Sequence, residues 1–187
     1  MLTKHIRSKF EVYWLKQINT LRIGPDGNDH NKLRTYKLFK GSFRAEPYIE
    51  QVINRNQRSF LTRLRISALT SLGIEKLRYS KPPVPVNDRI CIYCHDQNNS
   101  HIDDERHIFV CPKFKFLIEC FKNKMSLEIK GFCMLSENEQ FLTCMCPTSA
   151  QQAKAVNRFI KITFESRENI DNNKPNAQIN PFLDQLT

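Results

Sequence analysis

Three cysteines and one histidine stand at spacings typical of a zinc-binding knuckle. Cys91 and Cys94 form a Cys-x2-Cys pair, and His107 and Cys111 follow as His-x3-Cys after a twelve-residue gap. Zinc prefers four thiolate or imidazole ligands in a tetrahedron, and the short first gap lets one tight turn aim two thiolates at one ion. Because His107 and Cys111 are four residues apart, one helical turn would put them on the same side. Four protein ligands leave no open position for water, so the spacing predicts a structural Zn2+ site.

Other side chains near this pattern allow alternatives. His95 and His101 fall inside the gap and remain rival ligands to His107. The acidic run 103–105 also lies there and is interpreted as a solvated turn, since it does not close an apolar strand. Four further cysteines have no histidine at ligand spacing and are interpreted as buried, unreactive thiols. These cysteines are Cys120, Cys133, Cys144 and Cys146.

The composition of the 187-residue chain excludes several classes of protein. Apolar residues make up 40%, enough to form a core, so full disorder is not expected. No apolar run approaches the roughly 18 residues that a membrane span needs, and the first ten residues lack the apolar centre of a secretory signal. Seven cysteines without such a signal indicate a reducing intracellular compartment, nuclear or cytoplasmic, where clustered cysteines bind metal more often than they form disulfides.

Basic charge is concentrated in the first half of the chain. Residues 1–90 hold 18 Lys and Arg against 7 Asp and Glu, net +11, whereas residues 91–187 hold 11 against 12, net −1. A positive field confined to one half of a chain favours a polyanionic partner, and we expect nucleic acid, RNA or DNA. The residues predicted to contact phosphates are Lys32, Arg34, Lys37, Lys40, Arg55, Arg58, Arg63 and Arg65.

Helices are expected to present these basic residues. Apolar positions at helical intervals predict a helix over 9–22, which a turn cluster over 24–29 ends. A basic stretch over 32–44 has near-helical spacing until Gly41 interrupts it. Pro47 suits the first turn of a helix that reaches residue 53.

The clearest helix of the basic half spans 56–72. Arg58 and Arg65 fall together on the flank of its apolar stripe, and Gly73 suits its C-terminal cap. The stripe consists of Phe60, Leu61, Leu64, Ala68 and Leu72.

The second half also reads as helices. Pro112 could open a helix over 114–121, and Ser136 with Glu139 forms a capping box before a helix over 137–145. Ser149 and Gln152 form a second box. The apolar residues that follow it at three- and four-residue steps are Ala153, Val156, Ile160 and Phe164. The predicted organisation is a basic helical region over 1–80, a Pro-rich linker over 81–87, a knuckle with helices over 88–168, and a disordered tail over 169–187.

Several short segments between residues 31 and 116 follow one another in an order that is also found in other proteins. In this sequence they are residues 31–40, 46–48, 61–67, 74–75, 78–79, 89–94 and 103–112. In this order they resemble the carboxy-terminal region of reverse transcriptases from non-LTR retrotransposons. The resemblance implies a zinc knuckle appended to a polymerase, where it helps to hold template RNA or target DNA. It also favours His107 over His95 and His101 as the fourth ligand.

The sequence departs from that family in what it lacks. It contains neither the aspartate pair of the polymerase active site nor an endonuclease centre, so no enzymatic activity is expected. We expect a mainly α-helical nucleic-acid-binding module, stapled by one zinc knuckle, with little or no sheet. Two alternatives stay open: a zinc-folded adaptor that binds another protein, and a retroelement remnant without function.

Overall fold

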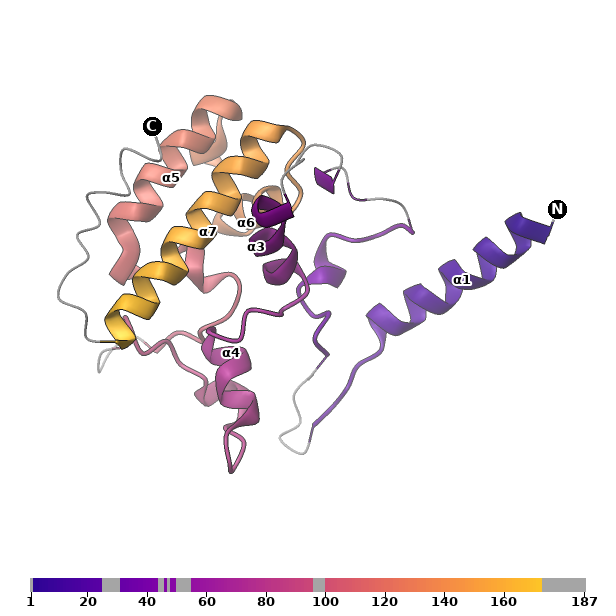
Figure 1. The fold of residues 1–187 in the computed structure, drawn as a ribbon, viewed down its shortest axis with the longest axis horizontal. Coiled ribbons are helices and arrows are strands. Elements are labelled where there is room, and N and C mark those ends of the chain that lie inside the picture. Colours follow the sequence, from indigo (N-terminus) through magenta and orange to yellow (C-terminus); the bar gives the residue numbers. More distant parts are fainter. Residues whose placement is uncertain are drawn as a thin grey trace.

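The structure is a computed structural model, and the chain in it is mainly helical, as the sequence predicts (Figure 1). It describes residues 2–24, 31–43, 46, 48–49, 55–95 and 100–172. Within these ranges no strand forms, although an antiparallel bridge pairs Ile90 with Ile102. The predicted turn over 24–29 and the predicted helix over 47–53 lie almost wholly outside the described residues.

The long helix α7 (Ala150–Asp171) organises the core. α3 (Arg55–Arg65) and α5 (Lys115–Glu128) both pack against it, and α6 (Glu137–Met145) lies beside it (Figure 1). The Phe159 ring of α7 stacks on Phe121 of α5 at 4.3 Å between centroids, and Phe109 lies 5.2 Å from Phe159. Burial of such large rings supplies most of the apolar stabilisation of a core this size.

The helix predicted over 56–72 ends earlier, at Arg65. Ser67 adopts a left-handed conformation with φ of 52°, which a helix cannot continue through. Gly73 does not cap this helix; it begins the short helix α4 (Gly73–Lys76), which continues as a 3-10 turn, η2 (Leu77–Tyr79). Three residues of the predicted stripe, Leu61, Leu64 and Leu72, are completely buried.

The first helix, α1 (Leu2–Asn19), begins and ends earlier than the predicted 9–22. Its end is fixed by Asn31, whose side-chain amide donates to the carbonyls of Ile18 (3.3 Å) and Thr20 (2.8 Å). Ile18 is buried, but most of α1 projects away from the other helices (Figure 1). The stretch predicted as a helix over 32–44 forms turns and the 3-10 helix η1 (Tyr36–Leu38) instead.

The helices after the cysteines begin where the sequence predicts. The Ser136–Glu139 capping box is present at the start of α6. Ser149 accepts the backbone N–H of Gln152 (3.2 Å) at the start of α7, although the Gln152 side chain turns to Thr148 rather than closing the box. α5 is longer than predicted, and α7 extends to Asp171, so the first residues of the predicted tail are helical.

The predicted regions on either side of 81–87 share one hydrophobic core. Leu61 and Leu64 from the basic half belong to the same buried cluster as Phe121 and Phe159. The backbone N–H of Leu61 also donates to the Asn157 side chain of α7 at 3.0 Å. The basic half is therefore built onto the helices of the second half.

Candidate metal centre

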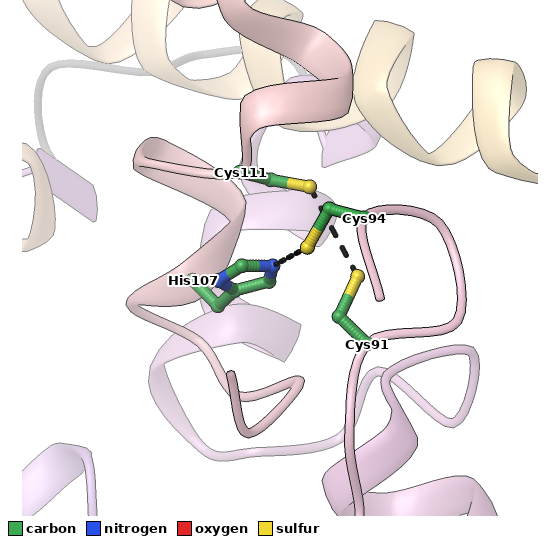
Figure 2. A group of neighbouring side chains, drawn as sticks. All are labelled: Cys91, Cys94, His107 and Cys111. Carbon is green, nitrogen blue, oxygen red and sulfur yellow. Dashed lines mark hydrogen bonds between the residues drawn. The ribbon is translucent and has the colours of Figure 1, made fainter. Parts of the chain in front are cut away.

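The four predicted metal ligands converge in space. The ligand atoms of Cys91, Cys94, His107 and Cys111 all lie within 4.8 Å of one another. Cys91 Sγ lies 3.9 Å from Cys111 Sγ, and Cys94 Sγ lies 3.2 Å from His107 Nε2. Figure 2 shows the four side chains pointing toward one another from two separate segments. This cluster could bind a metal ion.

Two short backbone segments position these ligands. Around the bridge between Ile90 and Ile102, Cys91 donates its N–H to the carbonyl of His101 (2.8 Å) and Asp103 donates to that of Arg89 (2.9 Å). The Cys-x2-Cys turn then folds back, so that the N–H groups of residues 93 and 94 point at the Cys91 sulfur.

The second pair of ligands comes from tight turns rather than from the single helical turn that the sequence predicts. His107 begins the 3-10 helix η4 (His107–Phe109), and Cys111 is the N-cap of η5 (Pro112–Phe114). Asp104 Oδ1 accepts the N–H of Arg106 and of His107, both at 2.9 Å, and this fixes the start of η4.

The proximity of the three thiols shifts their ionisation. The hydrogen bond from Cys111, helped by the backbone N–H groups, lowers the pKa of Cys91 to about 3. Burial and the neighbouring Cys91 charge raise the pKa of Cys94 to about 11. The hydrogen bond to Cys91, together with the smaller effect of burial, raises the pKa of Cys111 still further. One thiolate therefore suppresses ionisation of its neighbours unless a cation joins them.

The donor set and its dimensions fit a tetrahedral ion. Zn–S bonds of about 2.3 Å place two tetrahedral thiolates about 3.8 Å apart, and a shorter Zn–N bond gives a sulfur–nitrogen edge of about 3.6 Å. The 3.9 Å separation matches such an edge and the 3.2 Å separation is shorter, while all ligand atoms lie within 4.8 Å of one another, so small side-chain shifts would centre an ion among them. Cys91 and Cys111 are completely buried and His107 is 4% exposed, so the centre is largely closed to solvent.

The rival histidines lie outside the cluster. His101 is exposed, and its ring stacks on that of His107 at 5.4 Å between centroids, while His95 is also exposed. Of the four remaining cysteines only Cys144 is buried, whereas Cys133 and Cys146 are exposed. The prediction of buried thiols is therefore wrong for Cys133 and Cys146, because Cys133 lies in the 3-10 helix η6 (Phe132–Met134), where the buried residue is Phe132, and Cys146 is the C-cap of α6.

No family model, no curated protein and no solved structure matches this chain. Within the described residues, no helix is both long and apolar enough to cross a membrane.

Two of the three residues of the acidic run 103–105 are buried, which overturns its interpretation as a solvated turn. Asp103 is 3% exposed and forms a two-pronged ion pair with Arg167 of α7 at 2.8 and 3.1 Å. It also accepts the N–H of Gly73 (2.7 Å). Glu105 is 2% exposed and accepts Arg34 at 2.6 Å. These carboxylates join α4, α7 and the basic half to the loop that carries the ligands.

Sequence reasoning missed Arg167, which is 1% exposed. Its guanidinium lies 4.9 Å from the centre of the Tyr93 ring, inside the Cys-x2-Cys turn, and 5.8 Å from that of Phe114. A signal was present: the apolar stripe of α7 steps from Ile160 and Phe164 directly to Arg167. A charged residue on a buried stripe indicates a buried partner of opposite charge.

Apart from Arg34, which is ion-paired and 20% exposed, five of the eight predicted phosphate-binding residues keep access to solvent. Lys32, Arg55 and Arg63 are exposed, and Lys37 and Arg58 are partly exposed. Arg58 also donates a long hydrogen bond to the carbonyl of residue 49 (3.5 Å). Lys32 and Lys37 lie in the segment before α3, and the three arginines lie in α3, so these basic residues do not form a single row on one helix.

The other three form ion pairs with carboxylates: Lys40 and Arg65 are buried, and Arg34 keeps 20% of its side chain exposed. Arg34 bridges Glu75 (2.8 Å) and Glu105 (2.6 Å), and Lys40 lies 2.5 Å from Glu46. The prediction needs correction at these positions, because each charge already faces a carboxylate inside the protein. The three are Arg34, Lys40 and Arg65.

Arg65 is the most deeply placed of them. It is 1% exposed, donates to the carbonyl of Met145, and pairs with Glu46 at 2.6 Å. Its guanidinium lies 4.2 Å from the centre of the Phe39 ring and 4.6 Å from that of Tyr48. It joins α3 to the 36–48 segment and to the end of α6.

Proposed function

We propose that this chain is a zinc-stabilised nucleic-acid-binding module, similar to the carboxy-terminal region of non-LTR retrotransposon reverse transcriptases. The observation that carries the proposal is that the described acidic side chains between residues 31 and 82 face the protein interior while several basic side chains there face solvent. Glu46 and Glu75 are the described acidic residues between 31 and 82, and both are largely buried against basic partners. Lys32, Arg55 and Arg63 face solvent, so the described surface of this segment is positive. A positive surface of this kind attracts a polyanion.

The proposed metal is Zn2+, held by Cys91, Cys94, His107 and Cys111. Three thiolates and an imidazole are typical of closed structural zinc sites, and all four positions are filled by the protein. When bound, the ion would cross-link the 91–94 turn to the 107–111 segment. It would act on binding only by holding the fold.

A salt-series binding assay tests the nucleic-acid proposal. We expect the affinity of the zinc-loaded chain for an RNA or DNA probe of arbitrary sequence to fall steeply as the salt concentration rises. The Arg55→Ala/Arg63→Ala double variant should weaken binding to every sequence and reduce the logarithmic salt slope by roughly 1 to 2. Both arginines are exposed, so the fold should persist.

A matched control uses two exposed lysines of the near-neutral half. Lys113→Ala/Lys130→Ala removes the same charge from outside the proposed surface and should change affinity much less. Affinity that does not depend on salt, or an equal loss in both double variants, would count against a phosphate-binding surface on the basic half.

A protein-binding adaptor is the second candidate, and α1 favours it. Phe10, Val12 and Tyr13 of this helix are each at least 60% exposed, and Ile6 is 51% exposed. Exposed apolar side chains gathered on one element often mark a protein contact. Retention on heparin compared with retention on a nucleic-acid column at equal salt distinguishes the two candidate functions. A nucleic-acid-binding module should be retained more strongly by the nucleic-acid column, whereas a protein-binding adaptor should show no such preference.

A further inference from the structure

Tyr79 is a large aromatic residue that the fold leaves outside the core. It ends η2 and is 60% exposed. Lys32 Nζ lies 5.4 Å from the centre of its ring, and the guanidinium of Arg78 lies 5.7 Å away. Both cations lie over the ring, so a stacking base would have to move one of them aside, where it could meet the phosphate of the same nucleotide.

The turn that carries Tyr79 is tightly hydrogen-bonded. Val84 N–H donates to the carbonyl of Leu77 (3.2 Å), and the Ser80 hydroxyl donates to those of Leu77 and Pro82 (both 2.8 Å). The side chain of the buried Arg89 donates to the carbonyl of Val84 (2.9 Å) and so links the turn to the protein interior. In Figure 1 the turn protrudes beyond α4. A ring presented on a fixed turn loses little freedom when a ligand stacks on it.

The segment that carries the ring is rich in basic residues. Residues 76–81 contain Lys76, Arg78 and Lys81 and no acidic residue. Two of these cations are partly neutralised: Arg78 lies 3.7 Å from Glu75, which is 2% exposed and also pairs with Arg34, and Lys76 lies 4.0 Å from Asp171. Lys32 and Lys81 are exposed beside the turn.

We propose that Tyr79 is a stacking platform for an unpaired base of single-stranded nucleic acid, with Lys32 and Lys81 holding the adjacent phosphates. The inference rests on the proposed nucleic-acid binding and narrows its partner to a single strand. In a duplex the base faces are covered by neighbouring bases, so the ring has no partner there. A single strand exposes its bases, and aromatic stacking accepts any of them.

The test compares binding of matched single-stranded and duplex 20-mers, in RNA and DNA forms, by the zinc-loaded chain. Tyr79→Ala should weaken single-strand binding about tenfold and leave duplex binding and the salt slope unchanged. Tyr79→Phe keeps the ring and should bind like the unmodified chain, whereas Tyr79→Leu keeps bulk without the aromatic face and should resemble the alanine variant. The RNA and DNA arms show which strand chemistry the platform accepts.

Tyr13→Ala is the matched control, because Tyr13 is equally exposed at 61% but lies on α1, away from this turn. It should leave single-strand binding unchanged. Equal binding by Tyr79→Ala and the unmodified chain would overturn the stacking role alone, as would an equal loss in Tyr13→Ala or on duplex. A zinc-loaded chain that binds none of the four probes would overturn the proposed function as well.

Discussion

Arg65 and Glu46 show that the type of a residue does not determine its role. Arg65 carries the same charge as Arg63, two positions away, yet it is 1% exposed while Arg63 faces solvent. Glu46 accounts for the difference: it accepts Arg65 (2.6 Å), lies 2.5 Å from Lys40 and accepts the Tyr36 hydroxyl (3.2 Å). One carboxylate therefore organises two cations and a phenol inside the protein.

Glu46 should make the stability of the protein depend on acid pH. Burial alone would raise the pKa of Glu46, but the hydrogen bond from Lys40 and the charge of Arg65 outweigh it and lower that pKa below its usual value. A lowered folded-state pKa means that the stabilisation is present above the unfolded-state value and is lost as pH falls through the folded-state value. Glu46→Gln should cost about 2 kcal/mol of unfolding free energy at pH 7, since it weakens hydrogen bonds to charged groups.

Denaturant unfolding of both proteins at a series of pH values from 7 down to 4 checks this. The difference between the unmodified chain and Glu46→Gln should begin to shrink as the pH approaches the ordinary pKa of glutamate, because the unfolded chain then binds a proton that Glu46 resists in the folded protein. A difference that stays constant over this range would show that the charge of Glu46 is not the stabilising feature.

At the scale of elements, α4 and the acidic run are fitted together at Gly73. The N–H of Gly73 donates to Asp103 Oδ2 (2.7 Å), and that of Ile74 donates to the Asp103 carbonyl (3.0 Å). A Cβ at position 73 would lie 2.9 Å from Asp103 Cβ and 3.4 Å from the Arg89 carbonyl. Glycine is needed here because two backbone segments meet, rather than to cap a helix.

Gly73→Ala should therefore separate α4 from the ligand-bearing loop. We expect a loss of about 1–3 kcal/mol in unfolding free energy, the cost of overpacking a close contact. Gly41→Ala is the control, because nothing lies within 4 Å of a Cβ at that exposed position. Thermal unfolding measures both, and equal melting temperatures for the two variants would contradict the contact.

At the scale of the whole molecule, the candidate metal centre is part of the main core. Cys91 and Cys111 belong to the same buried cluster as Leu61 of α3 and Phe159 of α7. Arg167 extends this connection, since it ties α7 to Asp103 beside the ligand loop. Loosening the centre should therefore affect helices that are distant from it in the sequence.

Metal removal should unfold more than residues 88–120. Structural zinc contributes on the order of 10 kcal/mol, comparable with the roughly 5–15 kcal/mol that stabilises a whole domain. We expect chelation to raise amide exchange in α3 and α7 together with the ligand loop. Cys91→Ser should do the same, whereas Cys133→Ser, which changes an exposed thiol outside the cluster, should not. Exchange confined to 88–120 would show that the two halves fold independently.

Local sequence patterns were sufficient to predict where several helices of this protein begin and which of their residues are buried. The Ser136–Glu139 capping box fixed the start of α6, and the apolar stripe after Ser149 predicted most of α7, because helix starts and amphipathic faces depend on neighbours within a few residues. The end of α3 was not predictable in this way. It depends on Ser67 adopting φ of 52° and on Gly73 meeting Asp103, a contact across thirty residues.

The sequence by itself determined the helical class, the positive charge of the first half and the four residues that form the cluster, since ligand spacing and helical periodicity are short-range properties. Only the tertiary structure decided which charges face solvent. Lys40 and Arg65 turn inward to the largely buried Glu46, and Arg34 is drawn to the buried Glu75 and Glu105, because a buried carboxylate must have a partner. The same packing leaves Tyr79 outside, on a turn that no periodicity marks.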